Sequence, residues 1–304
     1  MAGVLEAESA PPRPGRRQFA SGRVWRQLVR QPVTVVAGLI LGAIFVAGAL
    51  VPRYTPSRTL INLSDRWRNH PPMLSGWHLF GTDSIGRDML VRTLWGLHAS
   101  EQSALAATLV ATVIGVTLGG LAGYRGGWLD TVIMRFTDLL AVFPAMMLLL
   151  AVYTWWEPVT AWRAAAIFAF YLWIPMARVV RGEFSSLRGR EFVQAELSLG
   201  ASDRRIFFRH LLPNASGTII IAATSTLGLI FVLEATLEFF GIGVPSDLYP
   251  TLGSLIGDGE RDVFALGQGW WPWAAPAAVL VLILVCINLV GDGLADALRP
   301  ARRR

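Results

Sequence analysis

The sequence contains no lysine, a single cysteine and few charged residues. All 27 basic residues are arginine. Without lysine the chain cannot build a phosphate-binding P-loop or form a Schiff base, which excludes both kinds of active site. The lone Cys286 excludes an intrachain disulfide, and the four histidines have no ligand spacing, so we predict no metal site. The chain is therefore expected to carry no catalytic chemistry of its own.

Charge is scarce because apolar residues dominate. Hydrophobic residues make up 53% of the chain and charged residues 16%, and the mean hydropathy is +0.48, values typical of membrane proteins. A helix crosses a bilayer with about 20 apolar residues. Six such spans are predicted, over residues 33–51, 103–124, 131–153, 161–180, 215–238 and 273–293. The predicted fold class is an all-α polytopic transmembrane helical bundle in contact with the lipid bilayer.

The placement of arginines predicts the orientation. The N-terminal tail 1–32, the loop 181–214 and the C-terminal tail 294–304 are basic and lie on one side, which the positive-inside rule assigns to the cytoplasm. Residues 52–102 then form an external loop with an amphipathic segment, and residues 103–293 form a five-span core. A pI near 10.3 can indicate nucleic-acid binding, but here the arginines that flank the spans account for it. Nucleic acid is therefore not a predicted partner.

The loop 181–214 has the pattern of a folded docking element. Four residues at helical spacing predict a short helix over 192–199, which Gly200 ends. These residues are Phe192, Ala195, Glu196 and Leu199. Ser202 and Asp203 can cap a second short helix, and Pro213 ends that helix or starts the next span. The predicted helix–turn–helix would act as a rigid lever on the fourth and fifth spans.

At these residues the chain resembles the permease subunits of binding-protein-dependent ABC importers. Their cytoplasmic loop reads EAA, three residues, glycine, nine residues, isoleucine, one residue, LP. Here QAE at 194–196 matches EAA, Gly200 matches the glycine, and Leu212 with Pro213 matches LP. FGTDSIGRDMLVRTLWG at 80–96, LEATLEFFGIGV at 233–244 and NLVGDGLADALRP at 288–300 are similar to the C-type subunit of dipeptide, oligopeptide and nickel permeases. The resemblance covers roughly residues 30–300.

The resemblance implies the type I ABC importer permease fold, a heterodimer with a B-type permease, two cytoplasmic ATPases and an external substrate-binding protein. ATP and Mg²⁺ would be bound by the ATPases, so this chain is expected to hold no cofactor. The cargo would be peptides or related small solutes. In the family the short helix of the loop sits in a groove on the ATPase. The predicted coupling residues are Gln194, Ala195, Glu196, Gly200, Ala201, Ser202, Asp203, Leu212 and Pro213.

The chain departs from the family pattern at three of these loop positions. Gln194 stands where the family has its first glutamate, and His210 stands where many members have isoleucine. Glu196 replaces the second alanine and could substitute for the missing carboxylate one helical step away. We hypothesise that Glu196 and Gly200 are central to docking on the ATPase.

Two carboxylates near the outer end of the fifth span leave two interpretations open. Glu234 and Glu238 form either an external gate or binding-protein contact, or a pair solvated at the membrane interface. Arg135 and Asp138 are spaced for a helix-surface ion pair, which we favour over a charge relay. Pro144 is expected to kink or break the third span.

The segment GTD-x-x-GRD at 81–88 lacks EF-hand spacing, so no calcium loop is predicted. Instead, Thr82 or Asp83 is expected to cap an amphipathic helix that includes Met89 and lies on the outer surface. Glycines four apart at 38 and 42, and at 115, 119 and 123, indicate either close helix packing or the ordinary abundance of glycine in membrane helices.

Two other function classes compete with the importer. A stand-alone secondary transporter calls for internal inverted repeats and polar or broken helices near the midplane. The sequence shows no convincing repeat, and ionisable residues are scarce within the spans. A structural membrane subunit would not need a long patterned loop between the fourth and fifth spans.

Overall fold

The structure, a computed structural model, describes residues 27–55, 68–73, 78–156, 160–243, 249–266 and 269–298. Most of the predicted tail 1–32, the end of the tail 294–304 and parts of the loop 52–102 lie outside these residues. The named helices are, in chain order, α2 (Pro32–Tyr54), α3 (Met89–Arg125), α4 (Gly127–Ala141), α5 (Ala145–Trp155), α6 (Ala161–Arg188), α7 (Glu191–Ser198), α8 (Asp203–Ile206), the π-helix η3 (Phe207–Leu211), α9 (Leu212–Phe239), α10 (Leu252–Leu266) and α11 (Trp271–Leu298).

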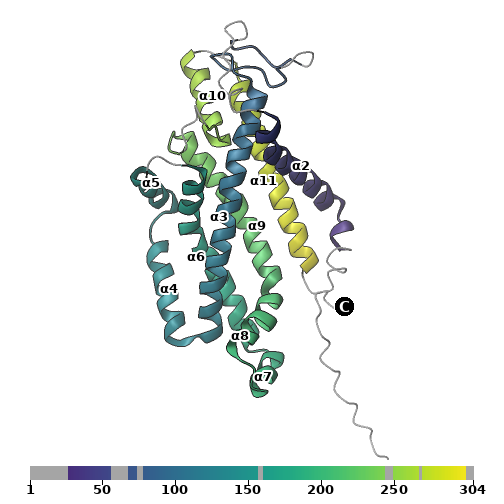
Figure 1. The fold of residues 1–304 in the computed structure, drawn as a ribbon, viewed down its shortest axis with the longest axis vertical. Coiled ribbons are helices and arrows are strands. Elements are labelled where there is room, and N and C mark those ends of the chain that lie inside the picture. Colours follow the sequence, from purple (N-terminus) through teal and green to yellow (C-terminus); the bar gives the residue numbers. More distant parts are fainter. Residues whose placement is uncertain are drawn as a thin grey trace, which may run out of the picture.

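The helices form an elongated bundle around α3 (Figure 1). Helices α6 and α9 pack beside α3, α2 and α11 lie together along one side, and α4 and α5 lie on the other. Helices α7 and α8 project from one end, and α10 covers the opposite end. Among the residues that the structure describes, five helices are long and apolar enough to cross a membrane, and the bent pair α4 and α5 would make a sixth span. The predicted six-span helical bundle is confirmed.

Close packing of α3 on α6 forms the centre of the bundle. A Cβ atom at Gly119 would collide with the backbone of Ala177, and one at Gly115 would lie 2.5 Å from the Met176 side chain. These glycines let the two helix backbones approach closely, which is one of the two interpretations that their spacing left open. The pattern in α2 does not pack in this way, because Gly42 has nothing within 4 Å of its Cβ position.

Two predicted helix boundaries are wrong. The amphipathic segment and the second span are one continuous 37-residue helix, α3, and Met89 is buried at its start instead of lying on an outer surface helix. Asp88 is the N-cap, since it accepts a hydrogen bond from the Val91 amide at 3.0 Å. Asp83, which we expected to cap the helix, accepts from the Ile85 and Arg87 amides of the preceding turn instead.

The third span is two helices and not one. Helices α4 and α5 meet at a bend of 83° just before Ala145. Pro144 provides the reason, because its ring removes a backbone donor and its φ of −57° and ψ of 128° leave the helical region. The break that the sequence predicted at Pro144 is therefore present, and it separates the span into two nearly perpendicular pieces.

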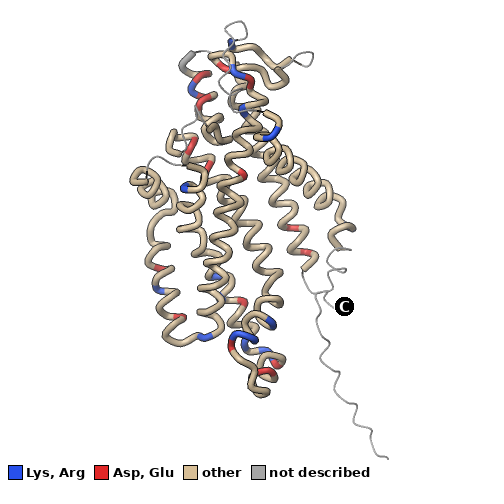
Figure 2. The backbone as a smooth tube through the Cα atoms, in the orientation of Figure 1, with Lys and Arg blue, Asp and Glu red and all other residues tan. Residues whose placement is uncertain are grey.

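Ion pairs join α4 to α6, while most charged residues gather towards the two ends of the bundle (Figure 2). Asp138 pairs with Arg178 of α6 at 3.0 Å, so the predicted partner Arg135 of the same helix is wrong. About two turns earlier in α4, Asp130 receives two hydrogen bonds from Arg181, at 2.5 and 2.6 Å. These pairs hold α4, the first half of the third span, against α6.

Candidate coupling site at the foot of the bundle

The segment that carries α7, α8 and η3, here called the foot, begins with a helix that ends at a glycine. Gly200 has a φ of +77°, in the left-handed region that a side chain disfavours. The amide of Ala201 donates to the Glu196 carbonyl at 3.0 Å, and that of Gly200 donates to Leu197. This is a Schellman motif, which satisfies the last carbonyl groups of α7. Ser202 then caps α8 by accepting from the Arg205 amide.

Apolar side chains fix the foot to the bundle. Val193 of α7, Ile206 of α8 and Leu211 of η3 are each fully buried. They belong to one cluster with Phe184 of α6 and Tyr124 of α3. Burying a side chain of this size contributes about 1.5–3 kcal/mol. The foot is therefore a rigid extension of the neighbouring ends of α3, α6 and α9.

Polar contacts add a second attachment, which includes α3. The hydroxyl of Tyr124 donates to Asp203 at 2.7 Å, and Arg125 lies 3.7 Å from the same carboxylate. Within the foot, Glu196 of α7 lies 3.6 Å from His210 of η3. The sequence predicted that the foot acts as a lever on the fourth and fifth spans. The structure shows that the foot is also attached to the second span, α3. Residues 79 positions apart form the Tyr124 contact, so no local pattern could have predicted it.

The foot continues into α9 through the π-helix. The amide of Leu212 donates to the Phe207 carbonyl, five residues earlier, and Pro213 follows with no amide hydrogen to donate. The side-chain amide of Asn214 donates to the His210 carbonyl at 2.6 Å and occupies an acceptor there. A π turn at this point lets the chain pass Pro213 without a break. Movement of the foot therefore acts directly on α9.

The outward face of α7 is apolar and uncovered. Leu199 is 83% exposed, Phe192 is 37% exposed, and Ala195 between them is exposed too. Glu196 lies beside this face and contacts His210, and its side chain is 28% exposed. Gln194 donates to the Arg188 carbonyl at 3.0 Å. A contiguous apolar face at the tip of a rigid projection is typical of a docking site for another protein.

A family model described as "Binding-protein-dependent transport system inner membrane component" matches residues 115–304, which include the core helices and the whole foot. The chain belongs to this family. It is a multi-pass inner-membrane protein and the permease component of a transport system.

Relatives of this permease match along nearly its full length. It is 37% identical over 294 residues to the oligopeptide transport system permease protein OppC of Mycobacterium tuberculosis, covering 94% of this chain and 97% of that one. It is 33% identical to the dipeptide transport system permease protein DppC of Bacillus subtilis, covering 92% and 85%. It is 35% identical to the glutathione transport system permease protein GsiD of Pectobacterium atrosepticum, covering 91% and 89%.

A solved structure shares the fold. The MetNI methionine ABC transporter, described in inward-facing conformations, matches with a TM-score of 0.52 and 20% identity over 70% of this chain and 97% of that chain. This likeness confirms the predicted type I importer permease fold. The full-length relatives, all described as permease proteins of transport systems, support the importer over the stand-alone transporter and the structural subunit.

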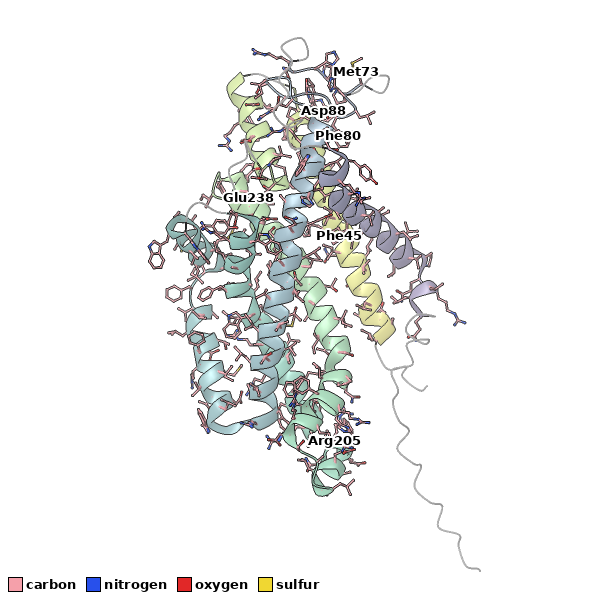
Figure 3. The ribbon with its side chains drawn as sticks, viewed as in Figure 1. Phe45, Met73, Phe80, Asp88, Arg205 and Glu238 are labelled. Carbon is pink, nitrogen blue, oxygen red and sulfur yellow. The ribbon has the colours of Figure 1, made fainter. Side chains whose placement is uncertain are left out.

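At the opposite end of the permease, the structure corrects the interpretation of the two glutamates. Glu234 and Glu238 are each 2% exposed, so the expectation that they are solvated at the interface is wrong. Ser103 of α3 donates to Glu234, and Thr251, just before α10, donates to Glu238, which Figure 3 labels beneath α10. The amide of Leu252 donates to Ser100 at 3.3 Å. Helix α10 therefore closes over a buried polar cluster; whether that cluster acts as an external gate or binding-protein contact stays a prediction.

Sequence reasoning missed α10 itself. Gly253 and Gly257 stand four apart, and a Cβ atom at either would lie 2.6 Å from the backbone of α9, at Ala235 and Phe239 respectively. The spacing of these two glycines was the available signal. The low hydrophobicity of the segment hid it, because a search for bilayer-long apolar runs cannot find a 15-residue helix.

Proposed function

We propose that this permease is the C-type subunit of a peptide ABC importer. It would pair with a B-type permease and receive cargo from an external substrate-binding protein. Two ATPases would bind ATP and Mg²⁺, neither of which this chain would hold. The foot would lie in the cytoplasm together with both chain ends. The resemblance of the loop 194–213 to the family motif and the names of the full-length relatives support this proposal.

The single observation that carries the ATPase contact is the exposed apolar face of α7. An isolated leucine with 83% exposure costs free energy in water, and its burial in a partner groove recovers about 1.5–3 kcal/mol. The face sits on an element that is fixed to three spans at once. No flexible loop lies between α7 and these spans. A force that a partner applies to α7 would therefore be transmitted directly to them.

This proposal revises the hypothesised role of Glu196. Its carboxylate lies against His210 and would brace α7 on η3. Docking would then depend on Phe192, Ala195 and Leu199, while Gly200 would keep the turn that presents them. The coupling residues from 201 to 213 would act by holding the foot to the bundle.

A substitution at the exposed face tests the ATPase contact. Leu199→Asp should lower ATPase co-purification and stimulated ATP hydrolysis at least tenfold, because it places a charge in an apolar interface. Phe264→Asp is the matched control, since Phe264 is 82% exposed on α10 at the other end of the bundle. Unchanged co-purification in Leu199→Asp would refute docking through α7. An equal loss in both variants would show a general defect.

The cargo is tested separately. Membrane vesicles that contain the complete importer should accumulate a labelled di- or oligopeptide when ATP and the binding protein are supplied. Vesicles with the Leu199→Asp permease should not. ATP-driven uptake of another small solute, with no peptide uptake, would refute the peptide assignment while leaving the coupling site intact.

A further inference from the structure

A basic groove opens on the side of the foot, apart from the apolar face of α7. It has a volume of about 610 Å³. Its lining residues are Ser202, Arg204, Arg205, Phe208, Arg209 and Pro213. Figure 3 labels Arg205 beside the lower end of α9, and Figure 2 shows basic segments concentrated there. The groove therefore combines three cations with an apolar wall.

The positive charge of this groove is not neutralised by the chain itself. Arg204, Arg205 and Arg209 form no ion pair with any residue in the part of the chain that the structure describes. Two acidic side chains of the foot are engaged elsewhere. Asp203 accepts from Tyr124, and Glu196 contacts His210. An anion that enters the groove would meet three exposed guanidinium groups, which bind phosphate oxygens in a bidentate manner.

The depth of the groove matches a lipid headgroup. The apolar stretch 215–233 of α9 has 19 residues and is about 28 Å long, close to the thickness of a hydrocarbon core of about 30 Å. Arg209 lies six residues beyond Ala215, or about 9 Å along the helix. The headgroup layer adds about 5–8 Å on each side of the core. A long arginine side chain reaches into that layer by snorkelling.

The apolar wall favours a lipid over a free anion. Phe208 is 59% exposed and lines the groove with Pro213. An aromatic ring at this height can pack against the carbon atoms of the headgroup whose phosphate the arginines hold. A free phosphate would gain nothing from that wall. A docked ATPase has its own apolar face on α7, farther from the bilayer.

We propose that this groove binds the headgroup of an anionic phospholipid of the adjoining leaflet through Arg205, Arg209 and Arg204, with Phe208 against the carbon atoms of that headgroup. The bound lipid would hold the foot at a fixed height on the membrane surface. The proposal does not depend on the cargo or on the ATPase contact. Its test also does not depend on which side of the membrane the foot occupies.

The experiment is native mass spectrometry of the full-length permease, purified in detergent together with its co-purifying subunits. Phosphatidylglycerol and phosphatidylcholine are added in equimolar amounts. The wild type should retain phosphatidylglycerol preferentially. Each interfacial arginine contributes about 1 kcal/mol, or roughly fivefold in affinity. Arg205→Gln and Arg209→Gln should each lower the preference about fivefold, and the double variant about 25-fold. Arg190→Gln is the matched control, because Arg190 is an exposed arginine outside the groove and should leave the preference unchanged.

Several outcomes would overturn the proposal. Equal retention of both lipids by the wild type would exclude an anionic headgroup site. An unchanged preference for phosphatidylglycerol in the double variant would show that the lipid binds elsewhere. If Arg190→Gln lowers this preference as much as the groove variants do, the effect is one of net charge alone. Displacement by glycerol phosphate at equal concentration would indicate a free-anion site. If the double variant keeps its lipid preference but no longer co-purifies with the ATPases, the groove is a protein-docking surface. Single variants keep the test valid if the double variant fails to fold.

Discussion

A substitution at the closest contact between α3 and α6 tests the central packing. In Gly119→Ala the new methyl group would collide with the backbone of Ala177. The methyl carbon would lie 2.8 Å from the Cα atom of Ala177, whereas ordinary contact begins at 3.4 Å. The obstacle is backbone in the middle of a helix, so no side chain can turn aside. The two helices must move apart, and such overpacking costs about 1–3 kcal/mol. That cost corresponds to a fall in melting temperature of roughly 3–8 °C.

The assay is thermal unfolding of the purified permease in detergent. Gly182→Ala is the control on the same pair of helices, because nothing lies within 4 Å of its Cβ position. That substitution should leave the melting temperature unchanged or raise it slightly, since alanine is the better helix former. If Gly119→Ala is as stable as Gly182→Ala, the close approach of α3 and α6 is wrong. Substrate uptake of Gly119→Ala, measured in parallel, should fall because the displaced helices carry the foot.

Two further predictions concern the two ends of the bundle. Thr251→Val keeps the shape of Thr251 but removes the hydroxyl that donates to Glu238, which should cost about 1–3 kcal/mol and increase proteolysis near α10. Thr251→Ser, which keeps the hydroxyl, should be closer to wild type, and equal sensitivity of both variants would contradict the role of the hydroxyl. At the end that carries the foot, Asp130→Arg should destabilise the contact of α4 with α6 by about 1 kcal/mol, and combination with Arg181→Asp should restore much of the loss. Purely additive effects in that thermal-unfolding cycle would show that the pair contributes nothing.

The sequence predicted the spans well because a bilayer sets their length and composition. The predicted span 33–51 became α2, and 161–180 became the membrane part of α6. It failed where polar residues lie inside the protein. Ser100 and Glu101 lie in the continuous helix α3, but composition alone marked the segment before 103 as external loop. Their burial against other helices is a property of the tertiary fold, which a scan of apolar runs does not register.

The coupling loop shows the same division between local and distant information. The stop at Gly200 and the cap at Ser202 were predictable because each depends on neighbours within five residues. The partner of Asp203 was not predictable, since Tyr124 belongs to another helix. The role proposed for Glu196 changed for the same reason: its helix position suggested the docking face, while its actual neighbour is His210 on the next element.

Helix α3 connects the two ends of the permease as one unbroken rod. At one end of α3 Tyr124 holds the foot through Asp203, and in the other half of the helix Ser103 donates to Glu234 beneath α10. These two attachment points are 21 residues apart, or about 32 Å along a single hydrogen-bonded helix. The third span cannot act in this way, because its 83° bend interrupts the hydrogen-bond ladder. We therefore expect α3, packed tightly on α6, to be a rigid route from an event at the foot to the polar cluster beneath α10.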